Sequence, residues 1–190
     1  MEQYDPELII NLIESDAKDF GGDSLHELVP MLERALKPLL AAKTEQDIAL
    51  LAKIGDVIGR INYADSWKRR IGILLAIAQS MQPVGRSIVG IPLAHSAYSL
   101  AQMQVTAYSE GDKLLDLSGA LAMQRQAGNA LAILYNDIGA PHRGLEFAIA
   151  AAVLAKQLND DVALARCLAN ATTSLRAQGL HRETISVSLR

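Results

Sequence analysis

Apolar residues recur every three or four positions along most of the chain, which is the spacing of one face of an α-helix. Seven apolar side chains follow this spacing between residues 25 and 39. Pro30 and Pro38 lie inside that pattern, so the helix either kinks at each proline or starts at Pro30 and breaks near Pro38. Strand-forming residues are scattered rather than clustered. The pattern therefore predicts an all-α protein.

Turn-forming residues divide the pattern into about eight or nine helices. Asp5-Pro6 is typical of an N-cap followed by a first-turn proline. Gly139-Ala140-Pro141 is typical of the end of one helix and the start of the next, and Asn159-Asp160-Asp161 is typical of another start. The predicted helices cover approximately residues 6–20, 25–39, 44–59, 67–81, 92–109, 113–138, 141–158 and 162–178.

Two stretches inside the chain leave alternatives open. Residues 86–92 show no clear pattern, so no helix is predicted before Pro92. Residues 113–138 form either one long helix or two short helices that divide at Gly128-Asn129. Further turns are expected at residues 20–22, 62–65 and 82–85 and at Gly111.

The end of the chain also leaves alternatives open. Only eleven residues follow Gly179, which is too few for a helix that matches residues 141–158. We therefore expect the array of helix pairs to continue in a longer protein. The alternation of Ile185, Val187 and Leu189 instead fits a short strand or a frayed tail.

Composition supports a stack of closely packed helices. Half of the residues are hydrophobic, but only 4% are aromatic and 29 are alanine. Small side chains let helices approach closely, which suits a stack of helices better than a globule built around large rings. Short turns force neighbouring helices to pack antiparallel. We therefore expect one helical-repeat domain over residues 1–190, with less regular helices in residues 1–43.

Charge and cysteine content limit the classes of partner. The formal net charge of −3 gives no general attraction to nucleic acid or to an anionic membrane. Cys167 is the only cysteine, which fits a reducing compartment. Residues 1–6 do not begin a signal peptide, and no apolar stretch approaches the ~20 residues of a membrane span. We therefore expect a cytoplasmic protein that binds neither nucleic acid nor membrane.

The last third of the chain repeats with a period near 40 residues. Gly139 and Gly179 lie 40 residues apart, and each ends a predicted helix that is rich in alanine and leucine. A period of this length is typical of a two-helix repeat unit. The clearest repeats are expected at residues 113–158 and 159–190.

The first of these repeats carries small and aromatic residues at Ala132, Tyr135, Gly139, Gly144, Phe147 and Ala151. The second carries Thr172, Leu175, Gly179 and Thr184. This arrangement resembles the tetratricopeptide repeat, in which small residues let helix backbones approach and aromatic residues fill the wedge between pairs. The resemblance implies antiparallel helix pairs stacked as a right-handed superhelix.

Residues 151–160, with the small and apolar residues that follow up to Gly179, also resemble the longer-helix variant of this repeat. That variant occurs in bacterial proteins before GGDEF diguanylate cyclase domains, histidine kinases or transcriptional regulators. The resemblance implies a non-catalytic protein–protein interaction module, such as the N-terminal sensory or dimerisation region of a bacterial signalling protein. Any catalytic domain would then lie outside this chain.

No residue pattern indicates a catalytic, metal or cofactor site. The histidines lie far apart in the sequence and have no other ligands at metal-binding spacing: His26, His95, His142 and His181. Cys167 lies in an apolar helix pattern, which favours a buried hydrophobic residue over a nucleophile. The acidic residues near Gly21-Gly22 lack the spacing of a calcium loop. We therefore expect no enzyme activity and no cofactor.

The segment Trp67-Lys68-Arg69-Arg70 has two interpretations. Three cations beside the only tryptophan are suited to bind a phosphate, a nucleotide or an acidic partner. A first helical turn of cations beside one anchoring aromatic residue is also an ordinary protein surface. The first interpretation supports an alternative function, a small-molecule or nucleotide-binding sensor with this segment near the mouth of its site. Residues 44–61 loosely match a helix-turn-helix, but they lack base-reading side chains, which disfavours DNA binding.

A repeat array of this kind holds a protein or peptide partner on its concave side. Besides Trp67–Arg70, the candidate contacts are polar or aromatic positions on the first helices of pairs: Tyr98, Gln102, Asn129, Tyr135, Asn136, Asn170 and Arg176. An open-ended stack also leaves an apolar terminal face, so we expect a homodimer.

Overall fold

The computed structural model describes residues 5–19, 25–41, 44–60, 67–110 and 116–188. Over these ranges the chain forms nine α-helices and no β-strand, which confirms the predicted all-α fold. The helices are α1 (Pro6–Asp19), α2 (Leu25–Leu39), α3 (Glu45–Arg60), α4 (Trp67–Ser80), α5 (Ser87–Ser109), α6 (Leu117–Asp137), α7 (Pro141–Gln157), α8 (Asp161–Ala177) and α9 (His181–Ser188). The predicted turns at residues 20–22 and 62–65 and at Gly111 lie outside the described residues.

Side-chain caps explain why several helices begin where the sequence predicts. The carboxylate of Asp5 accepts a hydrogen bond of 3.0 Å from the backbone N–H of Glu7, the second residue of α1. Thr44 and Asp47 form reciprocal side-chain to backbone hydrogen bonds of 3.2 and 3.3 Å at the start of α3. Asp160 caps α8 by accepting a hydrogen bond of 2.9 Å from the N–H of Ala163. Each cap satisfies a backbone donor that has no partner inside its helix.

Prolines lie inside two helices, and they affect the two predictions differently. α2 runs without interruption through Pro30 and Pro38, so the alternative that starts at the first and breaks at the second is wrong. α5 begins at Ser87, five residues before the predicted start at Pro92. Pro92 has no N–H to donate to the carbonyl group of Ile88. Ile88 lies in the first turn of α5 and is 69% exposed, and the helix continues through Pro92.

Two other helices continue through a glycine at which an end or a division was predicted. α3 extends past Gly59 to Arg60, so the predicted end at this glycine is wrong. α6 runs through Gly128 as one long helix, so the alternative of two short helices that divide there is wrong. Gly128 is buried where α6 crosses α7, and a Cβ atom there would lie 3.5 Å from the Cβ of Ala151. A Cβ atom there would make only ordinary van der Waals contacts, and the glycine marks no turn.

The segment after Gly179 is helical. Residues 181–188 form α9, so the alternative of a short strand is wrong. The backbone N–H and the hydroxyl group of Thr184 both donate to the carbonyl oxygen of Leu180, at 3.1 and 2.8 Å, and Thr184 is buried. Gly139 and Gly179 end α6 and α8 with φ angles of 76° and 74°, a left-handed conformation that glycine adopts without strain. The two turns are therefore alike in geometry.

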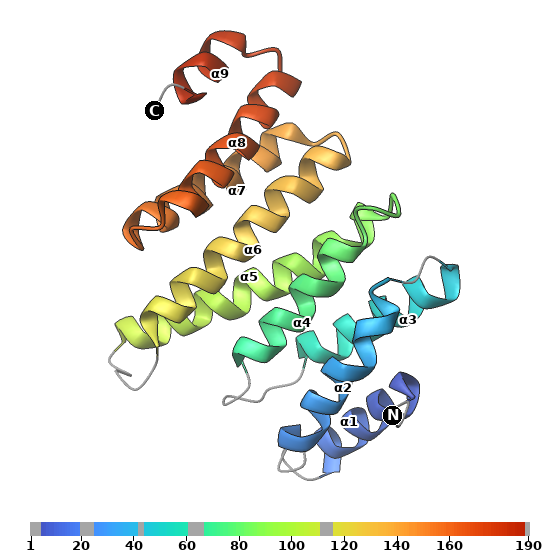
Figure 1. Cartoon of the computed structure of the whole chain (residues 1–190). Coiled ribbons are helices and arrows are strands. Elements are labelled where there is room, and N and C mark those ends of the chain that lie inside the picture. The colour runs from blue at the N-terminus through green and yellow to red at the C-terminus, as the bar shows by residue number, and fades with distance from the viewer. Residues whose placement is uncertain (1–4, 20–24, 42–43, 61–66, 111–115, 189–190) are drawn as a thin grey trace.

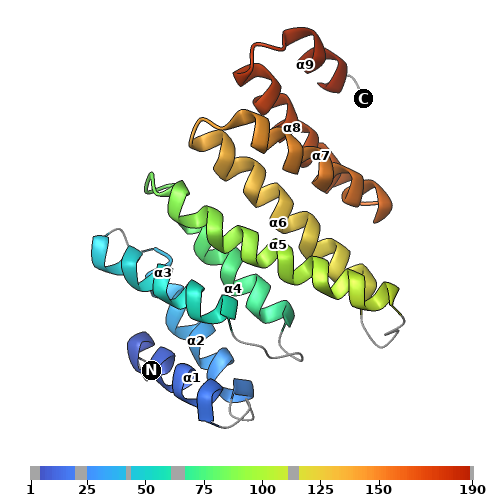
Figure 2. The ribbon, with the colours of Figure 1, turned by 180° about the vertical axis from the view of Figure 1, so that it is seen from behind.

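Helices α4 to α8 form two layers. Figure 1 shows α4, α6 and α8 in front of α5 and α7, and Figure 2 shows the same arrangement from behind. α6 contacts α4 on one side and α8 on the other, in addition to its chain neighbours α5 and α7. We call α4, α6 and α8 the A layer. Its three helices run in the same direction, which places their exposed sides on one face of the molecule.

The core changes character along the chain. In α1 to α4 it is filled by large aliphatic side chains, including Ile10, Leu32, Ile54, Ile71 and Leu74, all of which are fully buried. In α7 and α8 the buried apolar residues are mostly alanine: Ala148, Ala151, Ala152, Ala155, Ala163 and Ala171. The helices of the last third therefore pack through small side chains, as the composition predicts.

Candidate protein interaction site

Two side-chain hydrogen bonds join α6 to α8 within the A layer. Asn170 Nδ2 donates to Asn129 Oδ1 at 2.7 Å, and Ser174 Oγ donates to Asn136 Oδ1 at 2.8 Å. Three of the predicted contact residues thus lie together along this seam. Sequence reasoning missed Ser174, although its distance of 38 residues from Asn136 is close to the repeat period.

The Asn129–Asn170 pair keeps hydrogen-bonding groups that are not used. Both side chains are half-buried, and each amide offers two N–H donors and one carbonyl acceptor. The bond between them uses only the Oδ1 of Asn129 and one N–H of Asn170. Within the described residues, no other side-chain hydrogen bond engages either amide group. The pair therefore presents free N–H donors and a free acceptor next to each other.

Other side chains of α6 and α8 lie near this amide pair on the A layer. They follow helical spacing and are exposed or half-buried: Ala122, Gln126 and Ile133 on α6, and Arg166, Ala169 and Thr173 on α8. The arrangement is suited to binding rather than to bond-breaking chemistry, because none of these groups is a nucleophile paired with a base.

Two other predicted contacts, Tyr98 and Tyr135, lie in an aromatic cluster where α5, α6 and α7 meet. The Tyr135 ring stacks on Phe147 at 5.8 Å, and Tyr98 meets Phe147 edge to face at 5.6 Å. His95 Nε2 forms a hydrogen bond of 2.8 Å with the Tyr135 hydroxyl group, so His95 packs within the cluster. Burial, and then the charge of Arg143, lower the pKa of His95. The cluster joins two helix pairs and exposes little of either tyrosine.

The segment Trp67–Arg70 contains two buried side chains. Trp67 and Arg70 are only 8% and 5% exposed. Arg70 donates to the carbonyl oxygens of Ile58 and Gly59, at 3.2 and 3.3 Å, and thereby satisfies the end of α3. Burial lowers the pKa of the Arg70 guanidinium. Arg70 is therefore occupied in fixing α4 against α3.

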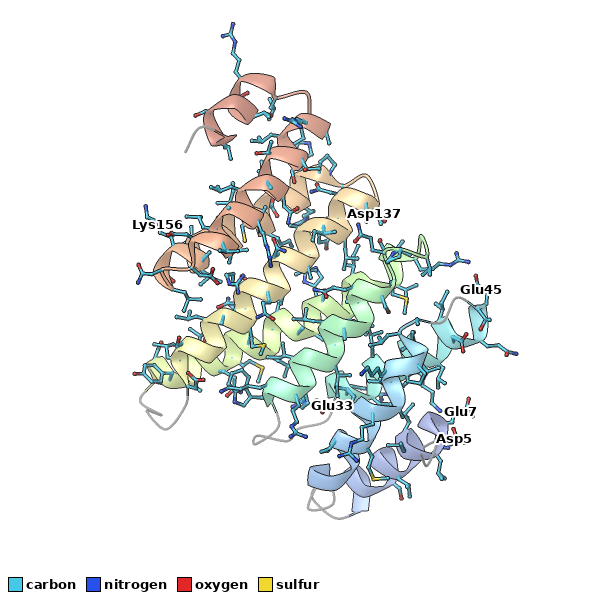
Figure 3. The ribbon with its side chains drawn as sticks, in the orientation of Figure 1. Asp5, Glu7, Glu33, Glu45, Asp137 and Lys156 are labelled. Atoms are coloured by element: carbon cyan, nitrogen blue, oxygen red, sulfur yellow. The ribbon has the colours of Figure 1, made fainter. Side chains whose placement is uncertain are left out.

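The two exposed cations of the segment contact different helices. Lys68 Nζ lies 2.7 Å from Asp116 Oδ2, at the start of α6, and 5.3 Å from the centre of the Trp67 ring. The hydrogen bond from Lys68, and then the one from the N–H of Gly119, lower the pKa of Asp116. Arg69 lies 3.8 Å from Glu33 of α2 (Figure 3). The structure does not bring the four side chains to one pocket, and their contacts give the alternative sensor function no support.

The remaining two predicted contacts do not lie beside the amide pair. Gln102 is on α5, in the other layer, where it lines a shallow depression of about 390 Å³ with Met103, Thr106 and Glu110. Arg176 is exposed on α8, six residues after Asn170. The seam of the A layer is therefore the only place where several of the predicted contact residues that the structure describes are joined by hydrogen bonds.

Cation–carboxylate contacts across the A layer were not predicted from the sequence. Lys68 of α4 pairs with Asp116, which caps α6, and Arg125 of α6 lies 3.6 Å from Asp160, which caps α8. Each pair links one A-layer helix to the cap of the next. The cap at Asp160 was predictable from the sequence. The pairing with Lys68 and Arg125 was not, because these cations lie 48 and 35 residues from their partners in the sequence.

No group of three His, Cys, Asp or Glu side chains lies close enough to hold a metal ion, among the residues that the structure places. None of the nine described helices is long and apolar enough to cross a membrane. Cys167 is fully buried, and this burial raises the pKa of its thiol.

Comparison of the chain with known protein families, with curated proteins and with solved structures finds no match in any of the three.

Proposed function

We propose that this chain is a non-catalytic protein–protein interaction module that binds a peptide segment of its partner along the A layer. The observation that carries the proposal is the half-buried Asn129–Asn170 pair with its unused donors and acceptor. A peptide group has one N–H donor and one carbonyl acceptor, so it complements this pair. Partly buried amides strengthen such bonds, because water competes less well for them.

We propose that the helix pairs form the tetratricopeptide-like superhelix that the sequence resembles. Three features support this arrangement: the parallel A-layer helices, the two left-handed glycine turns, and the close approach of α6 and α7 at Gly144. A Cβ atom at Gly144 would overlap the side-chain oxygen of Asn136 and lie 3.1 Å from the carbonyl oxygen of Ala132. In such a superhelix the A layer lines the concave side.

We further propose that the module is a regulatory region of a bacterial signalling protein, such as one that carries a diguanylate cyclase domain. The resemblance of residues 151–160 to the longer-helix repeat variant supports this part of the proposal. Within the described residues, the functional groups of the A layer suit recognition, which supports a role without catalysis.

Selection of peptides from a random display library against the purified chain tests the binding function. A selected peptide is then titrated by fluorescence anisotropy against the chain and its Asn129→Ala and Asn170→Ala variants. We expect each substitution to weaken binding roughly tenfold, the free energy of about one hydrogen bond in a partly buried site.

The matched control is Gln102→Ala, which changes an amide on the other layer and should leave the affinity unchanged. Melting temperatures of all variants show whether the fold is retained. Failure to enrich any peptide, or equal affinity for the chain and both asparagine variants, would contradict the proposal.

A further inference from the structure

The side of α7 that faces away from the A layer carries a regularly spaced stripe of exposed side chains. Figure 2 views the molecule from this side. The residues of the stripe follow one another at alternating intervals of four and three positions: His142, Glu146, Ile149, Val153 and Lys156. We call these five residues the α7 stripe. Such intervals keep side chains on one side of a helix, and they are the spacing of the seam between two helices of a coiled coil.

The centre of the α7 stripe is apolar. Ile149 and Val153 lie one helical turn apart and are 52% and 53% exposed. The residues that precede them, Ala148 and Ala152, are buried against the neighbouring helices. Isoleucine and valine are stiff at χ1, so they lose little conformational freedom when they become buried. The two side chains therefore form an apolar ridge against which another helix can pack.

The apolar centre lies between two opposite charges. Glu146 precedes it and Lys156 follows it (Figure 3), and Lys156 forms no ion pair with another described residue. The order along the helix is acid, apolar, apolar, base. When two copies of α7 pair antiparallel about a twofold axis, Glu146 of one copy faces Lys156 of the other, and Ile149 faces Val153. Parallel pairing places like charges opposite each other and is therefore disfavoured.

The other charges on α7 and in the turn after it are compatible with antiparallel pairing. Arg143 lies 3.2 Å from Glu146, but the two side chains are 66% and 63% exposed, so this ion pair contributes little free energy. The carboxylate of Glu146 has acceptor sites for a second cation. Asp160 contacts Arg125 at 3.6 Å, and Asp161 is exposed. Antiparallel pairing brings the end of α7 that carries Arg143 toward these two acids of the second copy.

We propose that two copies of this chain form a symmetric dimer through antiparallel pairing of their α7 stripes. A second copy is the occupant that the order of charges favours, because the stripe complements itself in this orientation. Both copies use the same surface, so association stops at the dimer. One helix from each copy buries less than the ~1,600 Å² of a standard interface, so we expect a weak dimer that forms at high micromolar concentration. The A layer stays free to bind a peptide.

Sedimentation velocity of the 190-residue chain from low to high micromolar concentration tests this dimer. We expect the weight-average mass to rise to that of a dimer and no further. Ile149→Ser/Val153→Ser removes the apolar centre and should keep the chain monomeric, and circular dichroism shows whether the helices are retained. The matched control is Ile88→Ser, at an exposed position of α5, which should dimerise like the unchanged chain.

A charge exchange tests the pairing of Glu146 with Lys156. Glu146→Lys and Lys156→Glu each place like charges opposite each other, so each should weaken the dimer roughly tenfold. An equal mixture of the two variants should associate again, because each end of the stripe then meets an opposite charge. Lys53→Glu on the exposed side of α3 makes the same change in net charge as Lys156→Glu and should leave dimerisation unchanged. Asn129→Ala should also dimerise normally, because the dimer does not depend on peptide binding.

Cysteine variants test the orientation of the two helices. Antiparallel pairing brings Ile149 of one copy next to Val153 of the other. An equal mixture of Ile149→Cys and Val153→Cys should therefore form a mixed disulfide faster than either variant links to itself, as mass spectrometry measures. Cys167 is fully buried and does not compete for this reaction.

Four results would overturn the proposal. The first is an unchanged chain that stays monomeric, or that grows beyond a dimer, at high micromolar concentration. The second is a dimer that persists in Ile149→Ser/Val153→Ser. The third is a mixture of the two charge variants that stays monomeric. The fourth is a preference of each cysteine variant for linking to itself, which indicates parallel helices.

Discussion

Helices α1 to α4 and helices α7 and α8 bury their apolar surface in different ways. α1 to α4 use large side chains such as Ile10, Ile54 and Leu74, whereas α7 and α8 use alanine at nearly every buried apolar position. Large side chains fill gaps of irregular shape, so helices there need no fixed spacing. Alanine allows only close approach, which fixes the distance and offset between helices. The regular period near 40 residues accordingly appears in the part of the chain that packs through alanine.

The largest expected effect on stability comes from replacing a large buried side chain of the first region with alanine, the residue that fills the core of the second. Leu74 is fully buried in α4, so Leu74→Ala removes buried methyl groups and leaves a cavity. We expect the free energy of unfolding to fall by about 2 to 5 kcal/mol. Urea denaturation followed by circular dichroism measures this change. A loss of less than about 1 kcal/mol would show that large side chains are not tightly packed in the first region.

The opposite exchange in the second region should have a smaller effect. Ala148 is fully buried in α7 and packs in a cluster with Ala132 and Ala171. Ala148→Leu inserts a side chain for which there is no space, and we expect a loss of about 1 to 3 kcal/mol in the same denaturation experiment. Ala49→Leu on the exposed side of α3 is the matched control and should change stability little. Equal stability of the two variants would contradict close packing through alanine.

The smallest expected effect concerns the aromatic cluster that joins the two regions. Burial and Arg143 lower the pKa of His95 in the folded chain, so the unfolded chain takes up this proton first as the pH falls. The contribution of neutral His95 to stability is therefore complete above the unfolded pKa of about 6.5, and it is lost as the pH falls through the lower folded pKa.

Urea denaturation at several pH values between about 7 and about 5 measures this loss. His95→Asn should reduce the pH dependence, while His142→Asn at an exposed position should leave it as it is. If the stability of His95→Asn depends on pH as strongly as that of the unchanged chain, the lowered pKa of His95 is not the source of this dependence.

The sequence was sufficient for the fold class and for the helices whose ends carry strong local signals. Gly139 and Pro141 mark the turn between α6 and α7, and Asp160 marks the start of α8, because caps and turns depend on residues close together in the chain. The start of α5 was wrong because Pro92 lies inside that helix instead of at its first position.

Features that depend on distant residues were not predictable in the same way. Gly128 resembles a break in the sequence, but α6 continues through it where it packs on α7. Lys68 and Arg70 looked like one basic cluster, but their partners come from α6 and α3. The asparagines of the A layer were identified as contact residues, whereas their pairing followed only from the spatial arrangement of α6 and α8.

The contacts that join neighbouring helix pairs connect residues separated by nearly one repeat unit. Asn129 and Asn170 are 41 residues apart, His95 and Tyr135 are 40 apart, and Asn136 and Ser174 are 38 apart. A gene duplication that inserts a whole unit at one of the glycine turns would give every such residue a new partner of the same kind. Lengthening by entire modules is therefore the change in size that this architecture tolerates best during evolution, whereas shorter insertions inside a helix would misalign all of these pairs.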